Sequence, residues 1–466
     1  MKRLIPIIVF MLALLPACAT VQSSMPQPKP EAIKGPIGER FVLDNGMVLL
    51  VKENHALPMV MVNVLVKAGA VMEPPEKAGL AHLTAGLLTK GAAGMSATEI
   101  SERIDFIGGS LSTGAGTDFA TAGLTVLKKD VDTGFSLLSQ VLMSPDFKEP
   151  EIDRLKTSIK AGIIREEEEP SAVASKAFMK MVFGDANPYG REAEGTVQSL
   201  DKITRDDVVS FHKRLYAPNN AIIAVVGDIS ATEAKMLVAR FLAGWEKKEI
   251  PAPVIPEPPV PNGVEEKLID RDITQADVLM GHRGVMRENP DYYTLYVMNY
   301  ILGGGGFVSR ILDKIRDDMG LAYSAYSYFT PDKYDGLFTV GLETKNSTTK
   351  LAIDETIKIV DKIRVEPVTD KELQDAKDYI TGSFARKMDT NAKIAELLTQ
   401  VEFYNLGLDY FQTYEREVLK VTKDDVLKAA QKYLHPDNMY IVVVGNLKEA
   451  GMEKQAPAMS PAAPGQ

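Results

Sequence analysis

Apolar residues recur along this chain with two periods, one helical and one typical of buried strands. After residue 207 they follow helical spacing, at Val208, Val209, Phe211 and Leu215. Thr204 before them is a favourable N-cap, and Asp207 places an acid where the helix dipole favours one. A turn at Pro218 then leads to residues 221–226, a β-branched run that predicts a buried strand.

The same pattern returns 218 residues later. Thr204, Asp207, Pro218, Asn220 and Gly227 are repeated without a gap as Thr422, Asp425, Pro436, Asn438 and Gly445. Five matched positions at one offset indicate a tandem duplication. Between the copies, six prolines fall within residues 251–261. Proline interrupts helices and central strands, so we expect an extended linker there.

Other periodic segments fill both copies. They predict helices at 78–89, 97–107, 151–168, 295–302, 347–364 and 370–387, and strands at 59–66, 123–126, 336–342 and 439–444. We therefore expect an α+β fold of two tandem homologous domains, each with helices packed on a mainly antiparallel sheet. The expected bounds are 37–249 for the first domain, 250–262 for the Pro-rich linker, 263–450 for the second domain and 451–466 for a disordered tail.

The N-terminus has the features of an export signal. Lys2 and Arg3 precede an apolar run too short to span a bilayer. The run ends at Cys18 in a sequence that resembles the lipobox of bacterial lipoproteins, although an ordinary secretory signal is the alternative. The resemblance implies a signal peptide at 1–17, a lipidated Cys18 and a flexible tether at 18–36. With Ala19 after the cysteine, it also implies that the protein is anchored in the outer membrane of a Gram-negative bacterium and faces the periplasm.

Composition narrows the class of protein further. The 466 residues are 45% hydrophobic and 25% charged, as in globular proteins. With 53 basic and 63 acidic residues, the chain has no positive surplus for a nucleic-acid backbone. Its single cysteine permits neither an internal disulfide nor a cysteine zinc cluster.

Several segments resemble the pitrilysin/insulinase-type zinc peptidases, the inverted zincins with the metal motif His-x-x-Glu-His. Residues 79–83 (Gly-Leu-Ala-His-Leu) are similar to the start of the metal helix, and 187–190 (Asn-Pro-Tyr-Gly) to a further hallmark. The second-half signature is matched by four glycines followed by 309–312 and 315–324, the glycines being Gly303, Gly304, Gly305 and Gly306. The resemblance covers the chain from about Phe41 to Gly445.

The metal motif itself is degenerate. His82 is the only family ligand position that remains, because Ala85 replaces the general base and Gly86 the second histidine. An ungapped alignment places Gly162 at the third ligand. The other histidines, His55, His212, His282 and His435, have no ligand spacing, and the glutamates at 166–169 are typical of a solvated helix end. We expect no cofactor in this chain.

The resemblance assigns a different role to the second half. In two-half members of the family, an arginine and a tyrosine of the second half reach the substrate held at the zinc of another half, and Arg316 and Tyr323 match that pair. The residues alone favour a structural interpretation, in which Arg316 is a cation at a helix end and Tyr323 is a strand residue in an aromatic run with Tyr326 and Tyr328. The glycines at 303–306 lack the Gly-Lys-Ser/Thr of a phosphate loop, and the family implies contact with substrate.

These features favour one function over two others. The leading hypothesis is a non-catalytic, substrate-binding subunit, inactive alone, that completes in trans the active site of a zinc-bearing His-x-x-Glu-His sister acting on unfolded peptides. The alternatives are an inert scaffold or peptide-binding envelope protein, and a self-sufficient zinc endopeptidase with rearranged ligands.

Overall fold

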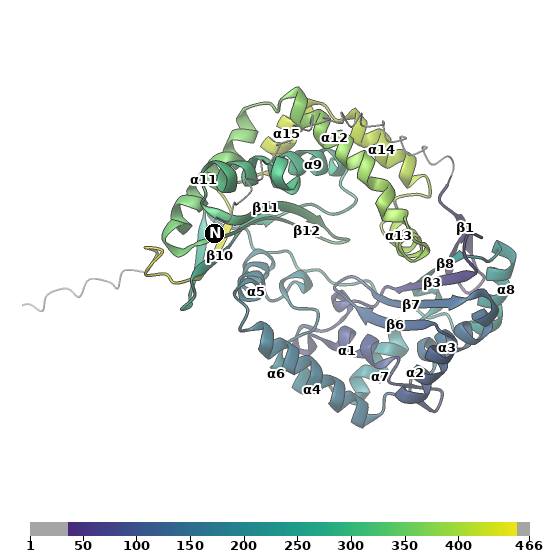
Figure 1. Ribbon diagram of the computed structural model, residues 1–466. Coiled ribbons are helices and arrows are strands. Elements are labelled where there is room, and N and C mark those ends of the chain that lie inside the picture. Colours follow the sequence, from purple (N-terminus) through teal and green to yellow (C-terminus); the bar gives the residue numbers. More distant parts are fainter. Residues whose placement is uncertain (1–35, 454–466) are drawn as a thin grey trace, which may run out of the picture. The chain divides into compact units, whose positions relative to one another are not determined.

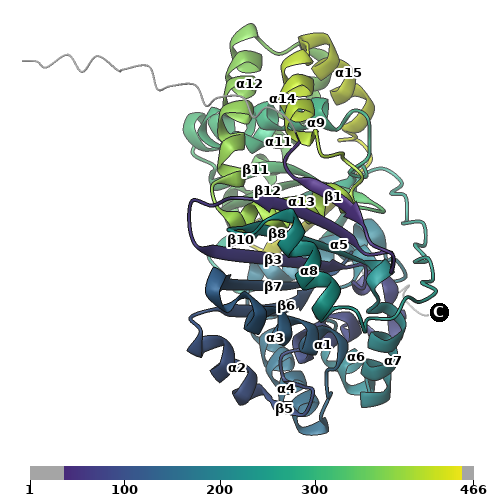
Figure 2. The ribbon, with the colours of Figure 1, turned by 90° about the vertical axis from the view of Figure 1, so that its right-hand side faces the viewer.

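A computed structural model describes residues 36–453, which contain two large β-sheets. The first sheet has the strand order β1 (Glu39–Val42), β2 (Val48–Glu53), β8 (Ala221–Gly227), β3 (Met59–Val66), β7 (Ala120–Leu127) and β6 (Ser110–Ala115). Figure 2 shows β8, β3, β7 and β6 one after another in this order. Only β2 and β8 are parallel; the other neighbours in the sheet are antiparallel.

The second sheet repeats this topology except for β1, which has no counterpart. Its order is β11 (Ala322–Pro331), β12 (Gly336–Lys345), β10 (Gln275–Arg283), β13 (Tyr440–Gly445) and β9 (Glu265–Asp270). Its one parallel pair, β13 with β9, corresponds to β8 with β2. Each strand overlaps its first-half counterpart when 218 is added, which confirms the two homologous α+β domains expected from the sequence.

Helices of each half cover one face of that half's sheet (Figure 1). In the first half they are α1 (Leu80–Leu87), α2 (Ala97–Phe106), α3 (Val131–Met143), α4 (Glu149–Glu166), α6 (Val197–Lys202), α7 (Arg205–Leu215) and α8 (Ala231–Phe241). In the second they are α9 (Tyr292–Asn299), α10 (Arg310–Leu312), α11 (Thr349–Val365), α12 (Asp370–Phe384), α14 (Tyr410–Lys420) and α15 (Lys423–Tyr433). A short hairpin of β4 (Gly91–Ala92) and β5 (Met95–Ser96) precedes α2.

The remaining two helices cross to the other half's sheet. Helix α13 (Asn391–Phe403) of the second half packs on β3 and β8, whereas α5 (Pro170–Phe183) of the first half packs on β10 and β13. Successive residues of β8 therefore face two cores: Ile223 belongs to its own half's core and Ile222 to the core that contains α13. Burial on both faces explains why β8 and β13 are continuously apolar.

Polar contacts fix α13 in place. Asn63 of β3 donates to the Thr399 hydroxyl at 2.7 Å, and Arg40 of β1 makes a two-point ion pair with Glu402 at 2.8 Å. Near the helix end, Phe119 and Phe403 meet edge to face at 5.1 Å. Because a bidentate arginine–carboxylate contact is geometrically specific, it fixes the register of α13 on the sheet.

The two ends of the chain are not part of this description. The predicted signal peptide, Cys18 and almost all of the tether lie outside residues 36–453, as does most of the predicted tail. Within these residues, no helix combines the length and apolarity needed to cross a membrane. Residues 250–262 contain neither helix nor strand, and the buried Asn187 side chain donates to the Pro256 carbonyl at 2.7 Å.

Candidate functional site

Helix α1 carries the degenerate metal motif, and a buried glutamate holds its N-terminus. Glu73 accepts hydrogen bonds from the backbone amides of Gly79 at 3.0 Å and Ala81 at 2.8 Å. These are helix-start amides that lack an intrahelical partner. Burial raises the pKa of Glu73 to about 7, although the two hydrogen bonds act in the opposite direction. Glu73 therefore fixes the start of α1.

The donor set on α1 does not fit a catalytic zinc ion. His82 is half-buried, and its Nδ1 lies 3.4 Å from the Ala115 carbonyl at the end of β6. Ala85 is fully buried, and Gly86 packs towards Leu155 of α4. Gly162, two turns further along α4, has open space beside its Cα. In the described part of the chain, no three His, Cys, Asp or Glu side chains are grouped so as to hold a metal ion.

The other histidines are dispersed and partnered. His55 contacts Asp228 at 2.6 Å, and His212 contacts the Leu142 carbonyl at 2.9 Å. His282 and His435 lie close, at 5.0 Å between ring centroids, and the His435 amide donates to His282. Burial lowers the pKa of His282 to about 4, and burial together with the charge of Arg364 also lowers the pKa of His435. Glu166, at the end of α4, forms an exposed ion pair with Lys176.

The glycine loop of the second half is built on π-helical turns. One covers Tyr300–Gly304 and another Asp313–Asp318, on either side of the short α10. A Cβ at Gly303 would lie 2.5 Å from the Ser327 amide, so this glycine permits close contact with β11. Asn299 and Ser327 exchange two hydrogen bonds that hold the loop to the strand. Gly306 has a φ of +60°, which favours glycine.

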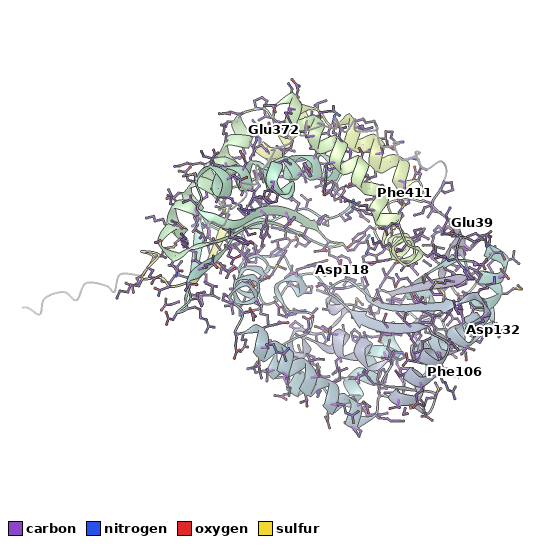
Figure 3. The ribbon with its side chains drawn as sticks, viewed as in Figure 1. Glu39, Phe106, Asp118, Asp132, Glu372 and Phe411 are labelled. Carbon is purple, nitrogen blue, oxygen red and sulfur yellow. The ribbon has the colours of Figure 1, made fainter. Side chains whose placement is uncertain are left out.

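An ion pair anchors the segment that follows. Arg310 of α10 contacts both carboxylate oxygens of Glu372 at 2.6 and 3.0 Å. Glu372, in the first turn of α12 (Figure 3), also accepts from Thr369 in a capping box. This arginine lowers the pKa of Glu372 to about 2 against the effect of burial. This ion pair attaches α10, which lies between the two π-helical turns, to α12. Turns of this kind occur frequently at functional sites.

Arg316 and Tyr323 lie together on the exposed side of this segment. The Arg316 guanidinium is 5.6 Å from the Tyr323 ring and 4.9 Å from the Phe307 ring, which follows the glycines. Tyr323 is 72% exposed and Phe307 66%. Within residues 36–453, the Arg316 side chain makes no ion pair with a carboxylate. Its guanidinium is therefore available to a ligand.

A β-bulge sets the direction of Tyr323. The pairing of β11 with β12 shifts register between Ala322 and Ser324, and Tyr323 is the extra residue. Tyr326 and Tyr328 contact each other at 5.1 Å further along the strand, whereas Tyr323 lies over Arg316. Bulges commonly redirect a side chain beside a functional site.

Sequence reasoning did not identify a buried polar network around Tyr189. Its hydroxyl donates to Asp118 at 2.5 Å and accepts from the Tyr334 amide at 3.2 Å, while Asp118 also accepts from the Lys333 amide. Asp118 lies in the turn between β6 and β7 (Figure 3). Burial raises the pKa of nearby Asp332 to about 7, with the charge of Asp118 adding to the rise. The Asn-Pro-Tyr-Gly segment at 187–190 was the available signal.

These features define a peptidase-like protein made of two related α+β units, with a degenerate metal helix in the first. The family profile "Insulinase (Peptidase family M16)" matches residues 48–196, and the profile "Peptidase M16 inactive domain" matches 202–380 and 420–458. The chain belongs to the M16 (insulinase) peptidase family.

Relatives of known structure and sequence agree with this membership. A crystal structure described as a peptidase M16 inactive domain, from Pseudomonas fluorescens, has a TM-score of 0.82 and 30% identity over 88% of this chain and 98% of its own. The "Non-peptidase homolog YmxG" of Helicobacter pylori is 26% identical over 86% of this chain and 92% of its own length. The "Uncharacterized zinc protease YmxG" of Bacillus subtilis is 27% identical over 77% and 86%.

Proposed function

We propose that this chain is a non-catalytic, peptide-binding subunit that completes the active site of a zinc-bearing M16 sister chain in trans. The observation that carries the proposal is the exposed cluster of Arg316, Tyr323 and Phe307 on an anchored segment. The metal helix of the same chain keeps a single ligand position, His82. A chain with half of an active site gains a function only when another chain supplies the rest.

Arg316 is suited to binding a peptide. A guanidinium offers several donors in a fixed plane, which match a peptide carbonyl or a terminal carboxylate. Phe307 and Tyr323 flank it with apolar surface, so a bound chain would lose water on both sides. Weaker solvent screening would strengthen each hydrogen bond from Arg316.

Tyr323 is suited to the reaction step. When water attacks a peptide carbonyl, negative charge develops on its oxygen, and a phenol hydroxyl can donate to it. The bulge at Ala322 and Ser324 fixes the backbone that carries this hydroxyl. The sister's zinc would supply the activated water, whereas this chain supplies binding and a hydrogen-bond donor.

Reconstitution with a sister chain tests the proposal. The sister is an M16 chain with intact His-x-x-Glu-His from the same genome, mixed with this chain at equal concentration. We expect each chain alone to be inactive towards an unfolded fluorogenic peptide, the mixture to be active, and this chain to hold no stoichiometric zinc by mass spectrometry. A sister that is fully active alone, and unchanged by this chain, would contradict the proposal.

The alternatives predict other outcomes. An inert scaffold would bind the sister without changing its rate of hydrolysis. A self-sufficient endopeptidase would cleave the peptide alone and lose that activity with a chelator.

The N-terminal sequence supports a location for the pair in the bacterial envelope. Metabolic labelling with palmitate tests the lipid anchor, and the label should be lost in Cys18→Ser.

A further inference from the structure

A cavity of about 510 Å³ opens beside α13, and none of Arg316, Tyr323 and Phe307 lines it. It is lined by residues of α13, by the segment before it and by Tyr404 and Tyr410 after it. Four of its lining residues are cationic, Arg287, Arg386, Lys387 and Lys393, whereas the one acidic lining residue is Glu396. The residues of the mechanism proposed above do not line this cavity, and neither do those of the degenerate metal helix α1.

Arg287 is a buried cation at this cavity. It is 9% exposed, and its guanidinium stacks 3.5 Å from the Tyr292 ring centroid. Its Nη2 donates to the Tyr410 hydroxyl at 3.0 Å. Among the described residues it makes no ion pair with a carboxylate. A buried charge without a counter-charge is costly, and an anionic ligand would remove that cost.

The cations at the mouth of the cavity extend this positive surface. Partial burial of its ammonium lowers the pKa of Lys387, and the charge of Arg287 lowers it further. Its ammonium has aromatic rings about it, at 5.6 Å for Tyr414 and 5.7 Å for Phe384. As with Arg287, no carboxylate within residues 36–453 pairs with Lys387. Lys393 differs, because Asp389 contacts it at 2.8 Å.

We propose that this cavity binds an acidic segment of a peptide, with Arg287, Arg386 and Lys387 holding its carboxylates. The inference rests on the proposed function and names the class of peptide that the subunit selects. Guanidinium groups bind carboxylates through two parallel hydrogen bonds. The tyrosine rings of the cavity provide apolar walls for the rest of the segment.

The dimensions favour a peptide over a small anion. The volume is in the range of sites that bury a drug-sized ligand, so a lone phosphate would leave most of it empty. A second cavity, of about 400 Å³, lies along the neighbouring face of α13 and shares Glu396 and Gln400 with the first. Ser110 and Ser112 of the edge strand β6 line it. An extended chain could therefore continue from one cavity into the next.

Binding by the full chain alone tests this inference. The probes are a short fluorescein-labelled peptide rich in glutamate and a matched peptide in which glutamine replaces each glutamate. We expect the acidic peptide to bind more tightly, with an affinity that falls as ionic strength rises. The double variant Arg386→Gln/Lys387→Gln should weaken its binding at least about tenfold. Lys350→Gln, which removes an exposed charge on α11 outside both cavities, is the matched control.

The outcomes separate this inference from the proposed function. Equal affinity for the two peptides would overturn the inference. A loss of affinity in the Lys350→Gln control as large as that in the double variant would also overturn it. Inorganic phosphate that binds while the acidic peptide does not would show a site for small anions instead. Activity of the reconstituted pair on the glutamine peptide, with no preference for the acidic one, would overturn the inference and leave the trans-acting subunit standing.

Discussion

The Tyr189 hydroxyl donates a 2.5 Å hydrogen bond to Oδ1 of Asp118, and both residues are buried. The same hydroxyl accepts from the Tyr334 amide, and Asp118 accepts from the Lys333 amide, so the contact also holds the β11–β12 turn of the second half. Two side chains of the first half thereby position a turn of the second.

Tyr189→Phe should destabilise the protein by about 1–3 kcal/mol, because it leaves a buried carboxylate and a backbone amide without their partner. Tyr334→Phe is the matched control, a partly buried tyrosine in the same region, and should change little. The free energy of unfolding in urea measures both. Equal stability of Tyr189→Phe and the wild type would show that the network contributes nothing.

Glu73 should make stability depend on pH. The folded protein keeps the proton of this carboxyl up to a pKa of about 7, whereas the unfolded chain releases it near 4.5. The folded state therefore binds more protons between these values, and stability falls as pH rises from about 4.5 to about 7. The loss amounts to about 3 kcal/mol and is constant above pH 7.

Glu73→Gln keeps an acceptor for the helix amides but cannot ionise. The difference in unfolding free energy between variant and wild type should grow over the same pH interval in favour of the variant. A difference that is independent of pH would show that the pKa of Glu73 is the same in the folded and unfolded states.

Restoring ligands to α1 and α4 should create zinc binding. With His82 retained, Gly86→His adds a second imidazole one turn along α1, and Gly162→Glu adds a carboxylate where space is open. We expect the double variant to retain zinc after dialysis, measured by mass spectrometry, and the wild type to retain none. Adding His82→Ala should abolish the gain; unchanged zinc in that triple variant would place the metal elsewhere.

In the reconstituted pair, Arg316 and Tyr323 should affect different kinetic constants. Tyr323→Phe removes a donor used only in the transition state and should lower kcat about a hundredfold with little change in KM. Arg316→Gln should chiefly raise KM, about tenfold, because it removes a contact made throughout binding. Tyr328→Phe, an exposed tyrosine of the same strand, is the control and should retain full activity.

The sequence predicted the duplicated segments and the helices and strands that have a clear local periodicity. The 218-residue offset, the helix with Thr204 as its N-cap and the buried strands at 221–226 and 439–444 all agree with the structure. Helices α3, α6, α8 and α14 were not predicted, and neither were α5 and α13. The packing surfaces of α5 and α13 belong to the opposite half, so nothing close in sequence indicates which of their faces is buried.

The candidate site was likewise predicted only in part from the sequence. The glycines and the family signature indicated Arg316 and Tyr323, but not the bulge that places Tyr323 over Arg316, since a bulge is set by pairing between strands. The cavity beside α13 was missed for a similar reason. Arg287 and Lys387 are a hundred residues apart in the sequence, and only the folded chain brings both to the lining of one cavity.

The exchange of α5 and α13 also limits how this protein can evolve. Neither half could be expressed from a separate gene without exposing the sheet face that the other half's helix covers. The two halves therefore depend on each other for folding. Differential scanning calorimetry should record one cooperative transition for the two halves. The two copies can diverge in sequence while they stay obliged to fold together.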